Sequence, residues 1–506
     1  MKRLILLLTA LTLLLSSCAA QPAASVRYEA LSPAENPYDA PTDDSGLAYT
    51  ASAALHLPNR SGQRLIVQYV PLELRYDVHP ARTILEALLS FPTNDDVRAL
   101  NYGTVATLAL HSRNPVEIAG GVCTVNLASS ALQLSYSNLY TVCLSIAATM
   151  TELPDVDAVN ILIADQAVAM DITGSLPLGT ISAIPGGELP VLWEQMDARR
   201  PPLGESPSGT PVSATVTLYF PLEDGSGFVP ETRSLSFPGQ DPRQLALVLV
   251  NALSDGAQYV SGAARMPSLG RLLNVDPIVN DLEDGGRMLT LRFNAGLEET
   301  LQLEGLDPTV FLGAVHRTLV TFIPSVSRVH IYSGDTLLDG LYSPIHGSTL
   351  FPDGLISRHH FSGCLMNQVT LYFSDGSLLT PVLRAVPHDE CASLRALVTE
   401  LMAGPDADES ARGLVSALPQ DLGSADVLGL ALKDGTLLVN LSGNFAQAVS
   451  ASDKNETLLC YSLVNTLCDA AQVDRVRFYF EGDMPGSLSG DIYWGGEFLR
   501  NPGLIR

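Results

Sequence analysis

The sequence predicts an α+β protein made of three tandem two-layer helix-on-sheet modules. One order of elements, strand-strand-helix-strand-strand-helix-strand, occurs three times along the 506 residues. Strands are indicated by alternation of apolar and polar residues, and helices by apolar residues three and four positions apart. Helices of this kind need a sheet face on which to bury their apolar stripes, which favours a sandwich of helices on a sheet.

Each module opens with a predicted β-hairpin. The turns contain Gly62, Gly225 and Gly376, each close to Asn, Asp or Ser. Such residues favour tight turns, so the alternating segments on either side are expected to pair. The first strands of the three hairpins contain residues 54–58, 217–221 and 370–374.

An amphipathic helix follows each hairpin. In the third module Gly404 and Pro405 end this helix, because glycine adopts the left-handed cap and proline cannot continue the hydrogen-bond ladder. Residues at helical spacing form one apolar stripe. The three stripes are Ile84, Leu85, Leu88 and Leu89; Leu245, Val248, Leu249 and Ala252; and Leu394, Leu397, Val398 and Leu401.

A second pair of strands, a longer helix and a closing strand complete each module. The second members of the strand pairs are 123–127, 289–293 and 437–441, and the closing strands are 158–163, 328–332 and 475–480. The apolar faces of the longer helices are Leu139, Val142, Cys143, Ile146 and Met150; Val310, Phe311, Ala314, Val315, Thr318 and Phe322; and Leu459, Leu463, Thr466 and Leu467.

Composition and element order divide the chain into modules and connecting segments. Segments rich in Gly, Pro and Ser are typical of spacers. The predicted parts are a signal peptide (1–17), a flexible tether (18–50), module 1 (51–173), a linker (174–213), module 2 (214–343), a linker (344–367), module 3 (368–495) and a tail (496–506).

The amino terminus has the features of a bacterial secretory signal. Lys2 and Arg3 precede an apolar run that ends at Leu15 and is too short to span a membrane as a helix. The sequence Leu-Ser-Ser-Cys ending at Cys18 resembles the lipobox of bacterial lipoproteins. This resemblance implies that Cys18 is diacylated and holds the chain on the outer face of the cytoplasmic membrane. The alternative is an ordinary signal peptide in which Cys18 has no role.

The charge of the chain argues against several classes of partner. The formal net charge is −25, and it becomes −27 once the cations of the signal, Lys2 and Arg3, are removed. Nucleic acid and anionic lipid surfaces should therefore repel the mature protein. No later apolar stretch approaches membrane-spanning length, so the anchor is expected to be the only membrane link.

Six cysteines remain when Cys18 is assigned to the lipid. Cys460 and Cys468 fall in one predicted helix, and a separation of ~12 Å along its axis exceeds the ~7 Å limit for bridged α-carbons. Cys123 and Cys143 lie on neighbouring elements, so they are either bonded or two buried thiols.

Four reactive side chains in a row, His388, Asp389, Glu390 and Cys391, form the strongest candidate for metal or thiol chemistry. They lie directly before a predicted helix, where capping and the helix dipole explain the carboxylates. Sequence neighbours also point in different directions, which does not suit a zinc site. The sequence contains no nucleophile elbow, phosphate loop or zinc-protease motif. We therefore expect no enzyme activity, no metal and no cofactor.

Two other groups of side chains were considered for binding. His359 and His360 lie in a predicted linker, where they are expected to decorate a loop. Tyr493 and Trp494 lie near the carboxyl end. Aromatic residues are common at interfaces, so this pair either forms a contact surface or covers the last sheet edge.

The third module resembles a GerM domain, the module named for sporulation and germination lipoproteins of endospore-forming bacteria. The second module keeps the order of strands and helices but lacks the Gly-Pro helix stop, and the first keeps Val125-Asn126-Leu127 but loses the Gly-Leu segment. The resemblance of the third module rests on the segments 369–373, 401–405, 413–419, 439–442 and 476–480.

The resemblance implies a lipoprotein of compact α/β modules, similar to ring-building modules, that associates with other envelope proteins. It brings no catalytic residues. We therefore expect an extracytoplasmic scaffold or adaptor that binds envelope or sporulation proteins, and the modules also allow self-association. The alternative is a lipoprotein that captures a soluble ligand, which predicts a deep pocket at a domain junction with converging polar groups.

Overall fold

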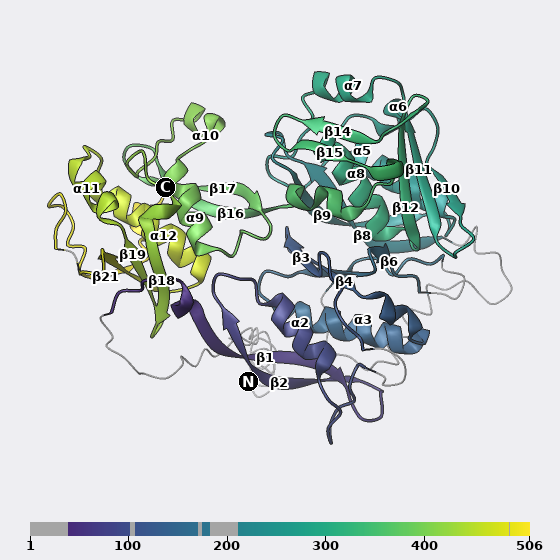
Figure 1. The fold of residues 1–506 in the computed structure, drawn as a ribbon, viewed down its shortest axis with the longest axis horizontal. Coiled ribbons are helices and arrows are strands. Elements are labelled where there is room, and N and C mark those ends of the chain that lie inside the picture. The colour runs from purple at the N-terminus through teal and green to yellow at the C-terminus, as the bar shows by residue number, and fades with distance from the viewer. Residues whose placement is uncertain (1–38, 102–106, 171–174, 183–210, 485) are drawn as a thin grey trace, which may run out of the picture.

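The computed structural model describes residues 39–101, 107–170, 175–182, 211–484 and 486–506. Its architecture is α+β, with three modules arranged around a common centre (Figure 1). Module 1 begins at the hairpin of β1 and β2, module 2 at that of β8 and β9, and module 3 at that of β16 and β17. The predicted order of strands and helices occurs in all three, so the predicted fold class is confirmed.

The hairpin that opens each module forms a separate two-stranded sheet. Both strands of each hairpin pair antiparallel over their whole length. The strands are β1 (Ala48–Pro58) and β2 (Leu65–Arg75); β8 (Val212–Pro221) and β9 (Phe228–Phe237); and β16 (Met366–Ser374) and β17 (Leu379–Pro387).

The remaining strands of each module form a second sheet with one repeated topology. Its first and second strands pair antiparallel, and its second and third strands, which the longer helix connects, pair parallel. Short antiparallel strands complete the edge. The strands are β3 (Val116–Ala119), β4 (Val122–Leu127), β5 (Ala158–Ile163), β6 (Gln166–Ala167) and β7 (Ile181–Ser182); β10 (Ile278–Asp281), β11 (Arg287–Phe293), β12 (Val326–Ser333) and β13 (Thr336–Leu337); and β18 (Val427–Lys433), β19 (Thr436–Leu441), β20 (Arg475–Phe480) and β21 (Glu497–Leu499).

The helices differ from expectation in how much of their surface is buried. The longer helix of each module packs between the hairpin and the second sheet, so it has no solvent stripe. From Leu139 to Met150 every residue is buried, and in module 2 every residue of the longer helix is buried. A helix that is apolar on all sides is typically a core helix. The main helices are α2 (Ala81–Ser90), α5 (Pro242–Ser254) and α9 (Leu394–Ala403), and the longer α3 (Tyr136–Met150), α8 (Pro308–Phe322) and α12 (Glu456–Ala471).

Shorter elements fill the connections between these parts. They are the helices α6 (Leu269–Leu272), α7 (Leu297–Leu303), α10 (Ala407–Ala411) and α11 (Gly443–Ala451); the strands β14 (Gly340–Ser343) and β15 (Gly347–Leu350); and the 3-10 turns η1 (Ser45–Leu47), η2 (Ser129–Gln133), η3 (Pro352–Gly354), η4 (Arg358–Cys364), η5 (Ser424–Asp426) and η6 (Pro502–Leu504).

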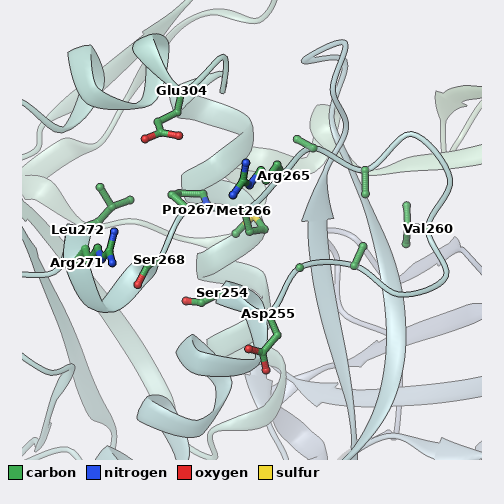
Figure 2. A pocket seen from close by; sticks show the side chains of 14 residues that line it. Ser254, Asp255, Val260, Arg265, Met266, Pro267, Ser268, Arg271, Leu272 and Glu304 are labelled. Carbon is green, nitrogen blue, oxygen red and sulfur yellow. The ribbon is translucent and has the colours of Figure 1, made fainter.

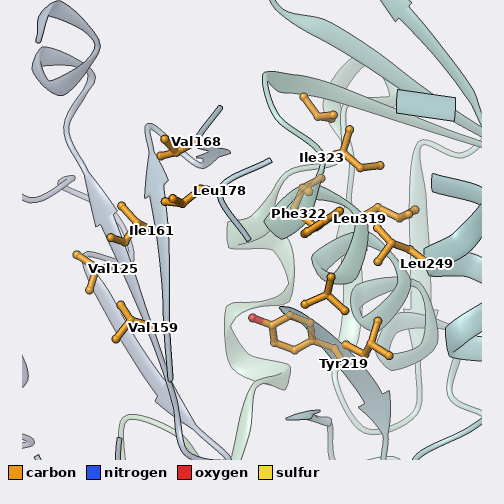
Figure 3. Packing of buried hydrophobic residues seen from close by; sticks show 14 of the residues in the cluster. Val125, Val159, Ile161, Val168, Leu178, Tyr219, Leu249, Leu319, Phe322 and Ile323 are labelled. Atoms are coloured by element: carbon orange, nitrogen blue, oxygen red, sulfur yellow. The ribbon is translucent and has the colours of Figure 1, made fainter. Parts of the chain in front are cut away.

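Modules 1 and 2 share one hydrophobic core, whereas module 3 has its own. Figure 3 shows Val168 and Leu178 of module 1 on the side of its strands that faces Phe322 and Ile323, at the end of α8. A continuous core of this kind makes two modules fold as one unit, because neither can be separated without exposing apolar surface to water.

Several segments predicted as spacers are packed into the modules. Leu47, inside the predicted tether, is fully buried in the core of module 3. The predicted linker 344–367 holds the buried side chains of Phe351 and Phe361. The predicted tail supplies β21, which pairs with β20. Composition identified these segments as polar and Gly-rich, but a few apolar residues in each fix them to the modules.

Among the described residues, no helix is both long enough and apolar enough to cross a membrane. The predicted signal peptide and Cys18 lie outside the described residues.

Candidate functional site

A buried cluster of three charged side chains joins modules 1 and 2. Glu117 on β3 accepts hydrogen bonds from Arg317 on α8, at 2.8 and 3.0 Å, and from Arg358 in η4, at 2.7 and 3.0 Å. Arg358 also donates to Thr321 and to the hydroxyl of Tyr219. Each charged side chain is at most 3% exposed. The three residues come from three different segments, which this cluster fixes to one another.

Electrostatics keeps this cluster ionised despite its burial. Burial alone would raise the pKa of Glu117, but the two guanidinium groups hold it well below its ordinary value. Burial, together with the same guanidinium groups, lowers the pKa of the neighbouring His316 to about 3, so that imidazole stays neutral. Buried charges are tolerated when each one is paired, and removing one member of the cluster leaves its partners as unpaired buried charges. The cluster is therefore a structural junction of fixed geometry.

A cleft of about 950 Å³ lies between modules 1 and 3. Hairpin β1/β2 and the end of α3 form one wall, and the start of β16 and the end of α12 form the other. Tyr69 projects into this region and is 67% exposed. The cleft is thus a domain-junction pocket of the type that ligand capture would require.

The polar groups of the cleft are already paired or uncharged. His79 Nε2 lies 2.8 Å from Asp155 Oδ2. Burial raises the pKa of Asp155, but the hydrogen bond with His79, the electrostatic attraction of that imidazole and a backbone hydrogen bond together outweigh it, and the net shift is downward. Burial raises the pKa of the Cys391 thiol, which donates to the carbonyl oxygen of His388. A protonated thiol is a poor nucleophile and metal ligand, so the cleft can bind a molecule more readily than it can react with one.

A second hollow, of about 770 Å³, lies on module 2 between the end of α5, α6 and Glu304 (Figure 2). Arg265 and Arg271 line it, and Asp255 lies at its lower edge in the view. All four of these charged side chains are exposed. The hollow is therefore open to solvent and differs from the more enclosed sites in which ligands are usually held.

In two of the three modules, the outward face of the second sheet, which points away from the core of its own module, is covered by another part of the chain. In module 1, Asn160 on β5 donates to Thr217 on β8 at 3.0 Å and accepts from Thr180. Figure 1 shows hairpin β8/β9 next to β3 and β4. In module 3, the amide of Asn440 on β19 donates to the carbonyl oxygen of Pro41 at 2.9 Å. The corresponding face of module 2 has no such partner among the described residues.

The candidate chemical site at residues 388–391 is a turn. Helix α9 begins later, at Leu394, and Ser393 is its N-cap through a hydrogen bond from the amide of Ala396. The predicted capping role of Asp389 and Glu390 is therefore wrong, because the helix starts too far along the chain, and both side chains are exposed. Among the described residues, no three His, Cys, Asp or Glu side chains are grouped to hold a metal ion.

The described cysteines are free thiols, and five of the six are buried. Cys123 and Cys143 are thus the two buried thiols of the alternative interpretation, without a bond between them. Burial raises the pKa of the Cys143 thiol to about 12. Both residues fill space in the core of modules 1 and 2.

The other candidate binding residues have structural contacts. Trp494 is fully buried against Phe478 and Phe480, whereas Tyr493 is 67% exposed. The tryptophan therefore covers the last sheet, as one of the two interpretations held. His360 accepts from the amide of Ser357 and so belongs to a cap, not to a free loop.

The Glu117 cluster was not predicted from the sequence. Its partners are separated from Glu117 by 200 and 241 positions, and nothing local indicates which residues pair. The available signal was a charged residue inside an otherwise apolar segment. Glu117 stands in the strand Val-Glu-Ile-Ala, and Arg317 stands inside the apolar helix α8.

Comparisons with known proteins identify a family for parts of the chain. A family model named Germane, described as sporulation and spore germination, matches residues 54–169 and 370–484. These segments lie in modules 1 and 3, so the predicted GerM-like family is confirmed there, and module 2 shares the strand order and pairing. No curated protein matches the chain.

Solved structures give further matches. The tandem GerMN domains of the sporulation protein GerM from Bacillus subtilis are 17% identical, with 57% of this chain and 92% of that chain covered and a TM-score of 0.21. The first GerMN domain of that protein is 18% identical, with 26% and 96% covered and a TM-score of 0.22. A candidate lipoprotein from Clostridium perfringens is 18% identical, with 26% and 87% covered and a TM-score of 0.16.

Proposed function

We propose, from the match of residues 54–169 and 370–484 to the sporulation and spore germination family, that this chain is a non-enzymatic adaptor that binds other envelope proteins. The observation that carries the proposal is the fixed arrangement of the modules. Modules 1 and 2 share a core and the Glu117 cluster, and the chain segment before module 1 is docked on module 3. A rigid array of similar modules presents several surfaces at set distances, as an adaptor requires.

The chemistry of the described residues supports a binding role. The carboxylates, imidazoles and thiols of the inter-module cleft are paired or protonated, as shown above for Asp155, His79 and Cys391. General acid-base or nucleophilic catalysis instead requires a group with a pKa tuned toward neutral pH and within reach of a substrate. The buried charges that the structure does hold serve the junction between modules.

We propose that Cys18 is the lipid attachment residue that holds this adaptor on the outer face of the cytoplasmic membrane. The described chain after it starts at Asp39 and lies along the second sheet of module 3. The array would then be tethered from the module 3 side. Replacing Cys18 by Ser should move the protein from the membrane fraction to the soluble fraction, or leave the signal uncut. Membrane retention of a correctly cut Cys18→Ser protein would refute the anchor.

Affinity purification from membranes of sporulating and growing cells tests the adaptor role. The tagged full chain should enrich a reproducible set of envelope proteins, with more of them during sporulation. The matched control is a variant carrying Glu117→Ala, in which the arrangement of modules 1 and 2 is loosened, and it should lose part of that set. An absence of enriched envelope proteins in both growth states would contradict the proposal.

Ligand capture remains a second candidate, favoured by the cleft of about 950 Å³ between modules 1 and 3. Native mass spectrometry of protein purified from its host should then show a retained small molecule. Ala54 lines the cleft and is only partly buried, so Ala54→Trp would fill the cleft without entering the core. Loss of the retained mass in this variant would support capture, and its absence in the unmodified protein would oppose it.

A further inference from the structure

Within the part of the chain that the structure describes, no other module bonds to the outward face of the second sheet of module 2. The side chains of this face are Met288, Thr290 and Arg292 on β11 and Arg328, His330 and Tyr332 on β12, which stand opposite one another in the parallel pair. The alternate residues of both strands, such as Leu289 and Ile331, are buried in the core. Side chains alternate between the two faces of a strand, so these six point away from the core.

The equivalent faces of the other modules are covered. In module 1 the matching side chains Thr124 and Asn160 are at most 3% exposed under the hairpin of module 2, and Asn126, 1% exposed, bonds to Asp165 of its own module. In module 3 Leu438 and Asn440 are each 3% exposed. In module 2, Thr290 is 9% exposed, Met288, Arg292, His330 and Tyr332 are half-buried, and Arg328 is exposed. Among the described residues, no hydrogen bond joins these side chains to another module.

The segment that covers module 3 indicates what such a face can bind. Residues 39–44 read Asp-Ala-Pro-Thr-Asp-Asp, so the segment is short and acidic. Asp44 pairs with Arg395 of α9 at 2.7 and 2.9 Å and accepts from the amide of Leu430, whereas Ala40 and the carbonyl oxygen of Pro41 contact the outward face itself. At Gly429 a β-carbon would lie 2.5 Å from the carbonyl oxygen of Pro41, so the segment lies directly on the strand.

The outward face of module 2 is basic within an acidic chain. The guanidinium of Arg292 lies over the ring of Tyr332 at 4.1 Å, a contact that holds its planar group in one orientation. Arg328 has an exposed partner in Asp284, at 3.0 Å, with side chains 45% and 54% exposed. Exposed ion pairs contribute little to stability, so a carboxylate of a ligand can readily replace Asp284 as the partner of Arg328. The formal net charge of the whole chain is −25, so these cations are a local exception.

We propose that this outward face of module 2 binds a short acidic segment of a partner protein, whose backbone covers the sheet as residues 39–44 cover that of module 3 and whose carboxylates pair with the arginines of this face. The proposal rests on the adaptor function and names the chemistry of one partner. Carboxylates of the segment pair with Arg292 and Arg328, and its backbone lies across β11 and β12. Planar bidentate pairing of this kind gives orientation as well as attraction.

A peptide binding experiment on the full chain tests the proposal. The probe is a labelled peptide with the sequence of residues 39–47, and its binding is followed by fluorescence anisotropy. Arg292→Glu with Arg328→Glu should weaken binding at least tenfold, and Arg292→Gln with Arg328→Gln should weaken it less. The matched control, Arg64→Glu with Arg412→Glu, makes the same charge change at exposed arginines of modules 1 and 3 and should bind as the unmodified chain does.

Several outcomes would overturn the proposal. One is that the unmodified chain does not bind the peptide at millimolar concentration. Another is that the charge-reversed chain, with a circular dichroism spectrum like that of the unmodified chain, binds the peptide equally well. A concentration-dependent dimer that dissociates in the Arg292→Glu, Arg328→Glu variant would assign the face to a second copy of this chain instead. An Asn-for-Asp version of the peptide must also lose affinity, since equal binding would show that charge is not recognised.

Affinity purification with the same variants separates this proposal from the adaptor function. If the charge-reversed chain recovers the full set of envelope proteins, the docking face is wrong and the adaptor role stands. If no chain recovers envelope proteins while the peptide still depends on Arg292 and Arg328, the face binds acidic segments and the adaptor role is wrong.

Discussion

At the scale of single residues, Glu117 has the largest expected effect on stability. Its carboxylate is shared by two arginines that are themselves buried, so its removal leaves two positive charges without a partner. We expect Glu117→Ala to destabilise the joined modules 1 and 2 by ~3–5 kcal/mol, the range for breaking a buried pair. Scanning calorimetry should show the corresponding fall in the transition temperature.

Glu86 provides the matched control for this prediction. It is a second glutamate of module 1 that pairs with an arginine, Arg82, but both side chains are more than half exposed. An exposed pair one helical turn apart contributes ~0.3–0.5 kcal/mol. Equal effects of Glu86→Ala and Glu117→Ala would show that burial of the cluster does not determine its contribution.

Glu456 predicts a specific dependence of stability on pH. It is 1% exposed and accepts hydrogen bonds from Ser489, from the amide of Asp491 and from the indole of Trp494. Burial raises its pKa, but these hydrogen bonds prevail and lower the pKa to about 2. A depressed pKa stabilises the fold above the unfolded value of ~4.3, and this contribution is lost as the pH falls toward 2.

The variant Glu456→Gln should therefore be less stable than the unmodified chain above pH 5, and the difference should shrink as the pH falls toward 2. Urea unfolding of module 3, followed by Trp494 fluorescence, measures it. Glu497→Gln is the comparison in the same module, since its side chain is 36% exposed. A difference for Glu456→Gln that stays constant with pH would mean that ionisation of this group is not involved.

At the scale of elements, one contact recurs between the longer helix and the first hairpin strand. Thr149 accepts from the amide of His56 and Thr318 from the amide of Tyr219, each at 3.0 Å. Ser462 donates to the carbonyl oxygen of Tyr372 at 2.6 Å. The hairpin strand has a free edge beside the helix, and a hydroxyl on the helix satisfies one of its backbone groups. This explains why polar residues stand in helices that are buried on all sides.

Removing the hydroxyl of Thr318 should show that the hairpin strand needs this hydrogen bond. Thr318→Val keeps the volume but leaves the Tyr219 amide without its partner, at a cost of ~1–3 kcal/mol for a buried unsatisfied donor. Thr466 in α12 is the matched control, because it is also fully buried while its own hydroxyl has no partner. Thr466→Val should be near neutral. Hydrogen exchange of residues 212–221 should accelerate for the first variant and stay unchanged for the second.

The elements of each module were predictable from the sequence because they depend on local periodicity. The stripe of Leu394, Leu397, Val398 and Leu401 did predict α9, and every one of these residues is buried. The longer helices were predicted with one apolar face, and their burial on all sides was missed. Helix α3 contains no charged residue, and the positions between its apolar residues, such as Ser145, are uncharged. This lack of charge was the signal in the sequence for burial on all sides.

The candidate sites were less predictable because they depend on which faces meet. Asn160 reads as an ordinary polar residue of a strand, yet it is 2% exposed and bonds to the next module. The role of residues 39–47 was also hidden, since composition alone suggested a free tether. Polar segments are fixed by a few contacts with distant residues, and local patterns contain no information on those contacts.

At the scale of the whole molecule, the start of the described chain closes onto its last module. Leu47 stands directly before β1 of module 1, but its side chain is fully buried in the core of module 3. Leu57, ten positions later on β1, is fully buried in the shared core of modules 1 and 2. The strand β1 therefore connects two separate cores, and the first and last modules are held together through it.

This arrangement predicts that two similar substitutions loosen different modules. Truncating a buried leucine to alanine costs ~2–5 kcal/mol in the core that contains it. Leu47→Ala should increase hydrogen exchange in β18 and β19 while leaving α2 and α3 protected, and Leu57→Ala should do the reverse. Each variant is the control for the other. If Leu47→Ala instead loosened module 1 alone, the contact between the chain start and module 3 would not contribute to stability, and other contacts, such as those of hairpin β16/β17 with modules 1 and 2, would hold the array together.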